Sequence, residues 1–123
     1  MIVTNVGSID SVDTTLLAHN TVNGITYKAH QSGNVVCISW NGNPETEIPD
    51  TTWIFPLTGL PSPALASATN DAIWNNYQAM VLGRYYDARV IRQQNGKANF
   101  DIITRGAIKT TDRMAGVFTY VAS

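Results

Sequence analysis

The sequence predicts a single all-β domain, either a jelly-roll-like β-sandwich or a small β-barrel, spanning residues 1–123. Short runs of β-branched and aromatic residues recur about every 8 to 12 residues, and Gly, Asn, Asp or Pro separates each run from the next. No segment has the apolar spacing of an amphipathic helix. Many short strands joined by tight turns are typical of sandwiches and small barrels. A chain of this length fits one domain of roughly 100 to 200 residues.

The N-terminal third predicts a hairpin preceded by a less regular segment. We expect residues 1–21 to form an N-terminal arm or a first strand. In residues 25–30 apolar and polar side chains alternate, which predicts a half-buried strand. Gly33 and Asn34 tolerate positive φ and favour a turn. Residues 35–40 are mostly apolar and predict a more fully buried second strand.

The middle of the chain is less regular. Residues 51–57 are rich in the β-branched and aromatic types that favour strands, and we expect this strand to end at Pro56. Residues 64–72 are small and polar and fit a helical turn or a loop. Residues 78–82 predict a further strand. Residues 83–87 then predict a loop or the edge of a strand.

The C-terminal part carries the clearest turn signal. Asn95-Gly96 lies between the apolar runs 88–93 and 99–104, and Asn-Gly in such a place is the strongest short-range sign of a hairpin. A last strand is expected at 116–121, with side chains alternating between its two faces.

The charge of the chain is low and nearly balanced. Charged residues make up 14% of the sequence, against about 25% in an average globular protein, and the formal net charge is −1. The hydrophobic fraction of 44% is not that of a disordered chain. Proteins that bind nucleic-acid phosphates usually carry an excess of Lys and Arg, which is missing here. We therefore expect no nucleic-acid partner and no adsorption to anionic membranes.

Several apolar residues are assigned to the interior. The single cysteine, Cys37, lies among apolar neighbours and predicts a buried, unreactive thiol. Trp40 and Trp53 lie within apolar strand runs and are expected in the core. No stretch approaches the roughly 18 apolar residues of a membrane span, so no membrane insertion is expected. Residues 1–6 lack the features of a signal peptide, which predicts synthesis in a cytosol.

No motif in the sequence points to catalysis. The nucleophile elbow Gly-x-Ser-x-Gly, the zinc motif His-Glu-x-x-His and a phosphate-binding loop are all missing. The two histidines, His19 and His30, have no second ligand at metal-like spacing. The carboxylates are scattered, and nothing selects a catalytic pair among them. We expect no enzyme activity, no cofactor and no bound metal.

Two segments, residues 71–77 and 84–87, combine aromatic side chains with polar ones. Saccharide sites use an aromatic platform for the C–H face of the sugar and polar groups for its hydroxyls, so these segments predict a ligand site with Trp74 as the platform. The alternative is that the aromatic residues pack in the core or at a subunit interface. The candidate ligand-binding residues are Asp71, Trp74, Asn75, Tyr77, Arg84, Tyr85, Tyr86 and Asp87.

A family resemblance rests on the Pro-rich segment in the middle of the chain. Residues 53–63 read Trp-Ile-Phe-Pro-Leu-Thr-Gly-Leu-Pro-Ser-Pro. With the hairpin at 24–40, the strand pair around Asn95-Gly96 and the Phe-Thr-Tyr at 118–120, this resembles the C-terminal head domains of tailed-phage receptor-binding and tail-fibre proteins. The resemblance extends over roughly residues 22–121 and is one of pattern. It implies a compact β-domain that forms trimers and binds host cell-surface saccharides near subunit boundaries.

The expected function follows from this resemblance. The protein would be a non-catalytic receptor-binding domain of a phage virion, made in the host bacterial cytoplasm, with a host surface saccharide, other virion proteins and its own copies in a homotrimer as partners. The alternative is a structural virion protein, such as a capsid-decoration or baseplate component. A free carbohydrate-binding module or a glycan hydrolase is a third class.

Overall fold

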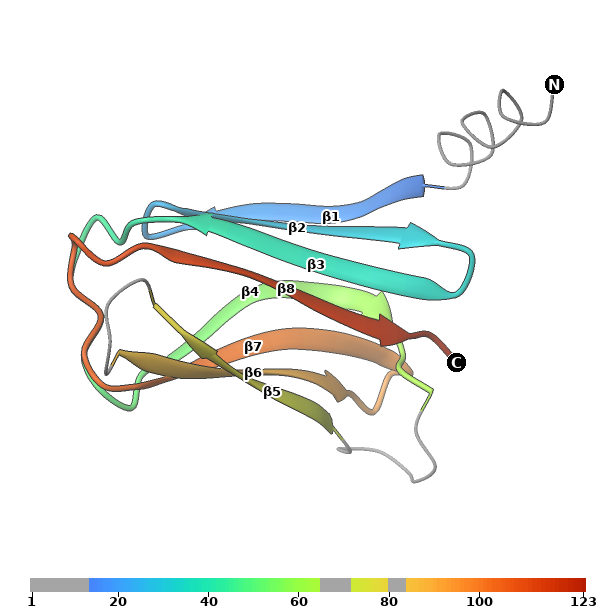
Figure 1. Cartoon of the computed structure of the whole chain (residues 1–123). Coiled ribbons are helices and arrows are strands. Elements are labelled where there is room, and N and C mark those ends of the chain that lie inside the picture. Colours follow the sequence, from blue (N-terminus) through green and yellow to red (C-terminus); the bar gives the residue numbers. More distant parts are fainter. Residues whose placement is uncertain (1–13, 65–71, 80–83) are drawn as a thin grey trace, which may run out of the picture.

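A computed structural model describes residues 14–64, 72–79 and 84–123, and these form two four-stranded antiparallel sheets packed face to face (Figure 1). The strands are β1 (Thr14–Val22), β2 (Ile25–Ser32), β3 (Val35–Gly42), β4 (Trp53–Pro61), β5 (Ala72–Gln78), β6 (Tyr85–Arg92), β7 (Lys97–Arg105) and β8 (Met114–Val121). Sheet I has the order β1–β2–β3–β8, and sheet II has the order β4–β7–β6–β5. The all-β sandwich is confirmed. The described strands do not close into a barrel.

The chain crosses between the sheets twice, after β3 and after β7. The two crossings lie side by side, because Ile48 and Ile108 donate a backbone hydrogen bond to each other, both of 2.8 Å. From β3 onward the chain therefore folds back as a two-stranded ribbon in which β3 pairs with β8, β4 with β7 and β5 with β6. In sheet II the return of β4 beside β7 gives a Greek-key order, the unit from which jelly rolls are built.

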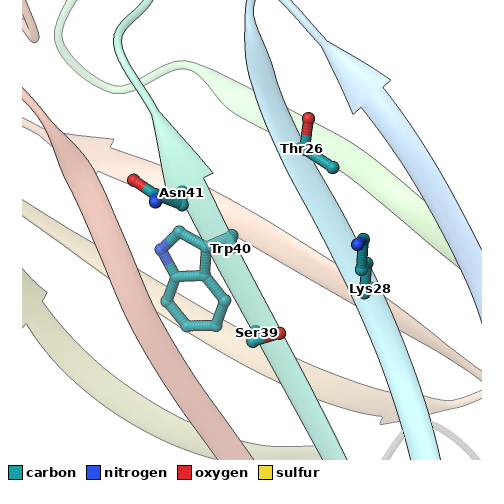
Figure 2. Close-up of a pocket in the computed structure, with 5 residues that line it drawn as sticks. All are labelled: Thr26, Lys28, Ser39, Trp40 and Asn41. Atoms are coloured by element: carbon teal, nitrogen blue, oxygen red, sulfur yellow. The ribbon is translucent and has the colours of Figure 1, made fainter.

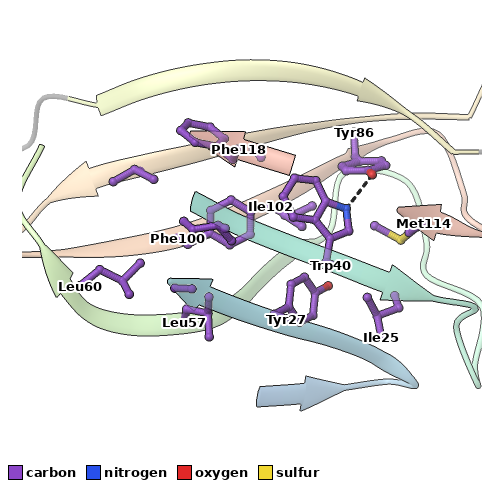
Figure 3. Packing of buried hydrophobic residues seen from close by; sticks show 14 of the residues in the cluster. Ile25, Tyr27, Trp40, Leu57, Leu60, Tyr86, Phe100, Ile102, Met114 and Phe118 are labelled. Atoms are coloured by element: carbon purple, nitrogen blue, oxygen red, sulfur yellow. Dashed lines mark hydrogen bonds between the residues drawn. The ribbon is translucent and has the colours of Figure 1, made fainter. Parts of the chain in front are cut away.

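The core lies between the sheets and contains buried side chains of β2, β3, β4, β6, β7 and β8, with partly buried residues of β1 and β5 packed against it (Figure 3). Trp40 is central to it, as the sequence predicts, because its ring packs against Phe100 and its Nε1 donates a 2.9 Å hydrogen bond to Tyr86 Oη. Gly116 lies opposite Trp40 on β8, where an added Cβ would come within 2.4 Å of the indole ring. Because Gly116 has no side chain, the Trp40 ring has room to pack in the core.

Both predicted hairpins are present. The alternation at 25–30 buries Ile25, Tyr27 and Ala29, and β2 continues to Ser32 before the turn. At the second hairpin, Gln93 donates to the Lys97 carbonyl and Gly96 has the positive φ of +80° that its turn requires. The expected last strand corresponds to β8, with Phe118 and Tyr120 turned inward.

The prediction that the strand at 51–57 ends at Pro56 is wrong, because β4 continues through Pro56 to Pro61. β4 is an edge strand, where a residue without an N–H is tolerated. Its register with β7 shifts on both sides of Leu57, and the bulges absorb the irregularity. The Pro56 carbonyl accepts a 2.9 Å hydrogen bond from Asn20 of β1 and so links the two sheets.

Two residues assigned to the interior lie on outer faces instead. The strand at 35–40 alternates in burial, so Cys37 lies half-buried on the outer face of sheet I, opposite His30 and Thr119. Trp53 is 38% exposed on the outer face of sheet II. The apolar runs around Cys37 and Trp53 predict strands that are buried on both faces. In a two-layer sandwich, however, each sheet is covered on one face only.

The strand expected at 78–82 lies earlier in the chain, as β5 (Ala72–Gln78), and residues 80–82 of the expected segment fall outside the described residues. Residues 65–71 also fall outside, and with them the loop or helical turn predicted at 64–72 and the candidate Asp71. Of the N-terminal segment, the described part forms β1.

Candidate functional site

The outer face of sheet II gathers aromatic and charged side chains. Residues directly opposite each other on neighbouring strands point to the same side of a sheet, so the strand register defines rows of side chains. One row runs across all four strands and the next across three of them. The first row is Trp53, Ile103, Asp87 and Asn76, and the second is Asp101, Arg89 and Trp74.

Three aromatic side chains and one arginine form a cluster over these rows, which we call the aromatic cluster: Trp53, Phe55, Trp74 and Arg89. The ring centroids of Trp53 and Trp74 are 6.2 Å apart, although they come from the two edge strands. The Arg89 guanidinium lies 4.4 Å from the Trp53 ring centroid and 5.4 Å from that of Trp74. Phe55 stacks against Trp53 with an interplanar angle of 7°. The arginine thus joins two tryptophans through cation–π contacts.

A buried carboxylate holds this arginine in place. Asp101 on β7 is only 2% exposed although it points to the outer face, and its Oδ2 accepts a 3.0 Å hydrogen bond from Arg89 Nε. Burial raises the pKa of Asp101, and the hydrogen bond and charge of Arg89 oppose that rise. The other oxygen, Oδ1, has no hydrogen-bond partner among the described residues. Among the described residues, Arg89 is therefore the group that compensates the charge of Asp101.

Beside the cluster lies an open hollow of about 460 Å³ lined by Trp74, Asn75, Asn76, Asp87 and Arg105, which we call the Trp74 hollow. Its polar groups are linked, because Asp87 Oδ1 accepts a 2.7 Å hydrogen bond from Asn76 and Oδ2 accepts a 2.9 Å bond from Arg105 Nε. Partial desolvation favours the neutral carboxyl, but the bonds from Asn76 and Arg105 and the arginine charge outweigh it and lower the pKa of Asp87. Asp87 is therefore ionised at neutral pH.

Three of the predicted ligand residues meet at this hollow: Trp74, Asn75 and Asp87. Trp74 is 46% exposed, so part of its ring is available for contact. Tyr85 lies on the same face but one row further on, opposite Gln78 and Arg105, and it does not line the hollow. In the two segments that carry the candidates, residues 72–77 lie in β5 and residues 85–87 in β6, and regular strands give their side chains fixed positions.

The other predicted site residues have structural places. Tyr86 is fully buried, and burial raises its pKa to about 12, so its neutral hydroxyl accepts the bond from Trp40. Tyr77 points inward, stacks on Tyr86 and donates a 2.7 Å hydrogen bond to the Val117 carbonyl of sheet I. Arg84 donates to the Ala107 carbonyl and lies 3.8 Å from Asp112. Their assignment to the ligand site is not supported by these positions, because the alternation of β5 and β6 turns both tyrosines into the core.

Six residues of the cluster, its buried carboxylate and the hollow were not among the candidates: Trp53, Phe55, Asn76, Arg89, Asp101 and Arg105. The signal that could have found Arg89 is the two-residue period of residues 85–92, which places Arg89 and Asp87 on one face and Tyr86, Ala88 and Val90 on the other. Trp53 and Arg105 come from β4 and β7. Their approach to Trp74 and Asp87 depends on the strand order of sheet II, which no local pattern contains.

A second hollow, of about 390 Å³, lies on the outer face of sheet I (Figure 2). Thr26 and Lys28 of β2 and Ser39 and Asn41 of β3 line it. Trp40 borders it along β3, but this tryptophan is only 3% exposed and its ring belongs to the core. The sheet I hollow therefore offers polar groups without an exposed aromatic platform, unlike the Trp74 hollow.

Among residues 14–64, 72–79 and 84–123, no group of three or more His, Cys, Asp and Glu side chains could hold a metal ion. The same part of the chain has no helix long and apolar enough to cross a membrane. A scan against protein-family models finds no match to this sequence, and a search of curated proteins finds none either.

Proposed function

We propose that this protein is a non-catalytic receptor-binding domain of a phage virion that recognises a host cell-surface saccharide at the Trp74 hollow. The main support for a saccharide site is that Trp74 is half exposed and lies beside hydrogen-bonding side chains, all of which are fixed on paired strands. An indole face packs against the C–H face of a pyranose ring, and Asn76, Asp87 and Arg105 supply acceptors and donors for its hydroxyls. The phage context, virion location and trimeric assembly rest on the resemblance of residues 22–121.

The chemistry of the hollow supports binding without catalysis. A glycosidase requires a general acid with a raised pKa beside a second carboxylate. The carboxylate that lines the hollow, Asp87, has a lowered pKa and both oxygens in hydrogen bonds. Asp101 has a raised pKa but lies beneath the aromatic cluster at 2% exposure. Neither carboxyl is placed to donate a proton to a glycosidic oxygen.

The second candidate function is a structural virion protein that contacts other virion proteins. The observation in its favour is the set of exposed apolar side chains on sheet I, where exposed patches mark contact surfaces in many proteins. They are Leu16, Val35, Val117 and Val121, at 51%, 39%, 55% and 48% exposure. The same surface also suits contact between copies in a trimer.

Binding to host cells, to purified wall polysaccharide and to virions separates these functions. The receptor-binding proposal predicts binding to cells and polysaccharide, and a Trp74→Ala variant should lose at least about thirtyfold in affinity, as when an aromatic hot spot is removed. Val117→Ala, at a similarly exposed position on sheet I, is the matched control and should bind as the wild type. Binding to virions alone would favour the structural candidate. Release of reducing ends from the polysaccharide would identify a hydrolase.

The stability of Trp74→Ala needs to be measured in the same experiment. Its ring is about half buried, so its loss exposes roughly 100 Å² of apolar surface and costs up to about 2 kcal/mol of unfolding free energy. Binding is therefore compared at a temperature where circular dichroism shows both variants folded. Undiminished binding by a folded Trp74→Ala variant would place the site elsewhere.

A further inference from the structure

The charges around the Trp74 hollow cancel in pairs. Arg105 Nε is 2.9 Å from Asp87 Oδ2, and Arg89 Nε is 3.0 Å from Asp101 Oδ2. Each arginine thus lies against one carboxylate, and within the described part of the chain these are the charged groups that line the hollow or belong to the aromatic cluster and its buried carboxylate. These four side chains offer a ligand hydrogen-bonding capacity, and their charges sum to zero.

The pair that lines the hollow is also fixed by a third group. Asn76, directly opposite Asp87 on β5, donates to Asp87 Oδ1, so both carboxylate oxygens have partners from side chains of adjacent strands. The lowered pKa of Asp87 keeps it negative at neutral pH. As far as the structure describes the chain, the oxygen of the Asn76 amide and the remaining N–H groups of Arg105 have no other hydrogen-bond partner and can bind a ligand.

We infer that the ligand of the Trp74 hollow is an uncharged saccharide, and that Asp87 is the residue that excludes acidic sugars. The inference rests on the proposed saccharide-binding function. An acidic sugar would bring its carboxylate or phosphate beside the ionised Asp87 and would have to compete with it for Arg105. An aminosugar cation would meet two arginines that already carry their counter-ions. Hydroxyl groups meet neither obstacle, because they donate to Asn76 or Asp87 and accept from Arg105.

A comparison of matched sugars tests this selectivity. Methyl hexopyranosides and the corresponding methyl hexuronosides differ by one carboxylate at C6, and each is titrated into the wild-type protein at low salt with the tryptophan indole NMR signals as the readout. The wild type should prefer the neutral sugar of a pair by about tenfold, which lies between the effect of two like charges about 4 Å apart in bulk water and the larger effect at the lower dielectric constant near a protein surface. Salt at about 0.5 M should reduce the preference through screening.

Substitutions at the pair give the decisive comparison. Asp87→Asn removes the negative charge and frees Arg105, so the ratio of neutral to acidic affinity should fall at least about tenfold. Arg105→Gln should lower affinity for the acidic sugar further and keep the preference for the neutral one. Glu45→Gln, which makes the same charge change in the loop between β3 and β4, is the matched control and should leave the ratio unchanged. Thermal unfolding of each variant shows that it is folded.

The outcomes distinguish this inference from the proposed function. A wild type that binds the acidic sugar more tightly, or an Asp87→Asn variant with an unchanged ratio, would overturn the inference and leave saccharide binding intact. If neither sugar of any pair shifts the Trp74 signal and polysaccharide binding also fails, the proposed function is wrong and the inference falls with it.

Discussion

Replacement of Arg89 by alanine is expected to destabilise the protein strongly and in a pH-dependent way. Within the described part of the chain, Arg89 supplies the single hydrogen bond of the Asp101 side chain, whose exposed fraction is 3%. Removal of one partner of a buried ion pair leaves an uncompensated charge and typically costs roughly 3 to 5 kcal/mol. This is a large fraction of the roughly 5 to 15 kcal/mol by which a domain is usually stable.

The sign of the pH dependence follows from the direction of the pKa shift. Burial raises the pKa of Asp101 in the folded protein above its ordinary value of 3.8, so the ionisation of Asp101 reduces stability as pH rises from the unfolded pKa through the folded one. Loss of Arg89 raises the folded pKa further, because the hydrogen bond and charge that lowered it are gone. The deficit of Arg89→Ala should therefore grow between about pH 4 and pH 7.

Urea unfolding at pH 4.5 and 7.0 measures this deficit. Arg105→Ala is the matched control, because its pair with Asp87 is exposed, with side-chain exposures of 49% and 24%, and should contribute less than about 1 kcal/mol. A second control, Arg89→Ala with Asp101→Asn, should lose the pH dependence of the single variant. A loss below about 1 kcal/mol for Arg89→Ala, equal at both pH values, would refute the reasoning.

Three further predictions concern the core, the thiol and the assembly. Gly116→Ala places a Cβ against the Trp40 ring and should cost about 1 to 3 kcal/mol of unfolding free energy, measured by urea denaturation, with little change taken as a contradiction. Cys37 lies on an outer face, so in native protein diluted until the trimer dissociates it should react with a thiol reagent within about tenfold of its denatured rate. Much slower labelling at all protein concentrations would contradict this position. Light scattering at micromolar concentration should give about three times the chain mass of 13.4 kDa, and a monomer would overturn the proposed trimer.

The fold could be predicted from the sequence where the information is local. Asn95-Gly96 defines its hairpin because few residue pairs accept the required backbone angles, and the alternation at 25–30 defines the buried face of β2 directly. The predicted strand end at Pro56 was wrong because proline is excluded from central strands but tolerated in edge strands. Nothing in residues 51–57 shows that β4 lies at an edge of its sheet. Edge position is a property of the whole sheet.

Only part of the candidate site could be predicted, because the rest depends on which strands are neighbours in the sheet. Trp74 and Asp87 were found because each lies in a polar and aromatic segment, but their partners come from strands distant in the sequence. Trp53 looked like a core residue because its neighbours are apolar, and only the pairing of β4 with β7 places it on the outer face. The prediction placed Tyr77 and Tyr86 in the site although both point into the core. Aromatic residues are common in cores and in binding sites, and local composition does not distinguish a core position from a site position.

The three tryptophans provide the most direct test of the central claim, that a saccharide binds on the outer face of sheet II at Trp74. Each indole N–H gives one signal in a ¹⁵N NMR spectrum, and single Trp→Phe variants assign them. Titration with purified host wall polysaccharide or its neutral oligosaccharides should shift the Trp74 signal in a saturable way. The Trp40 signal should stay in place, because its Nε1–H is bonded to Tyr86 in the core. Saturable binding that leaves Trp74 unmoved, or no binding at all, would contradict the account.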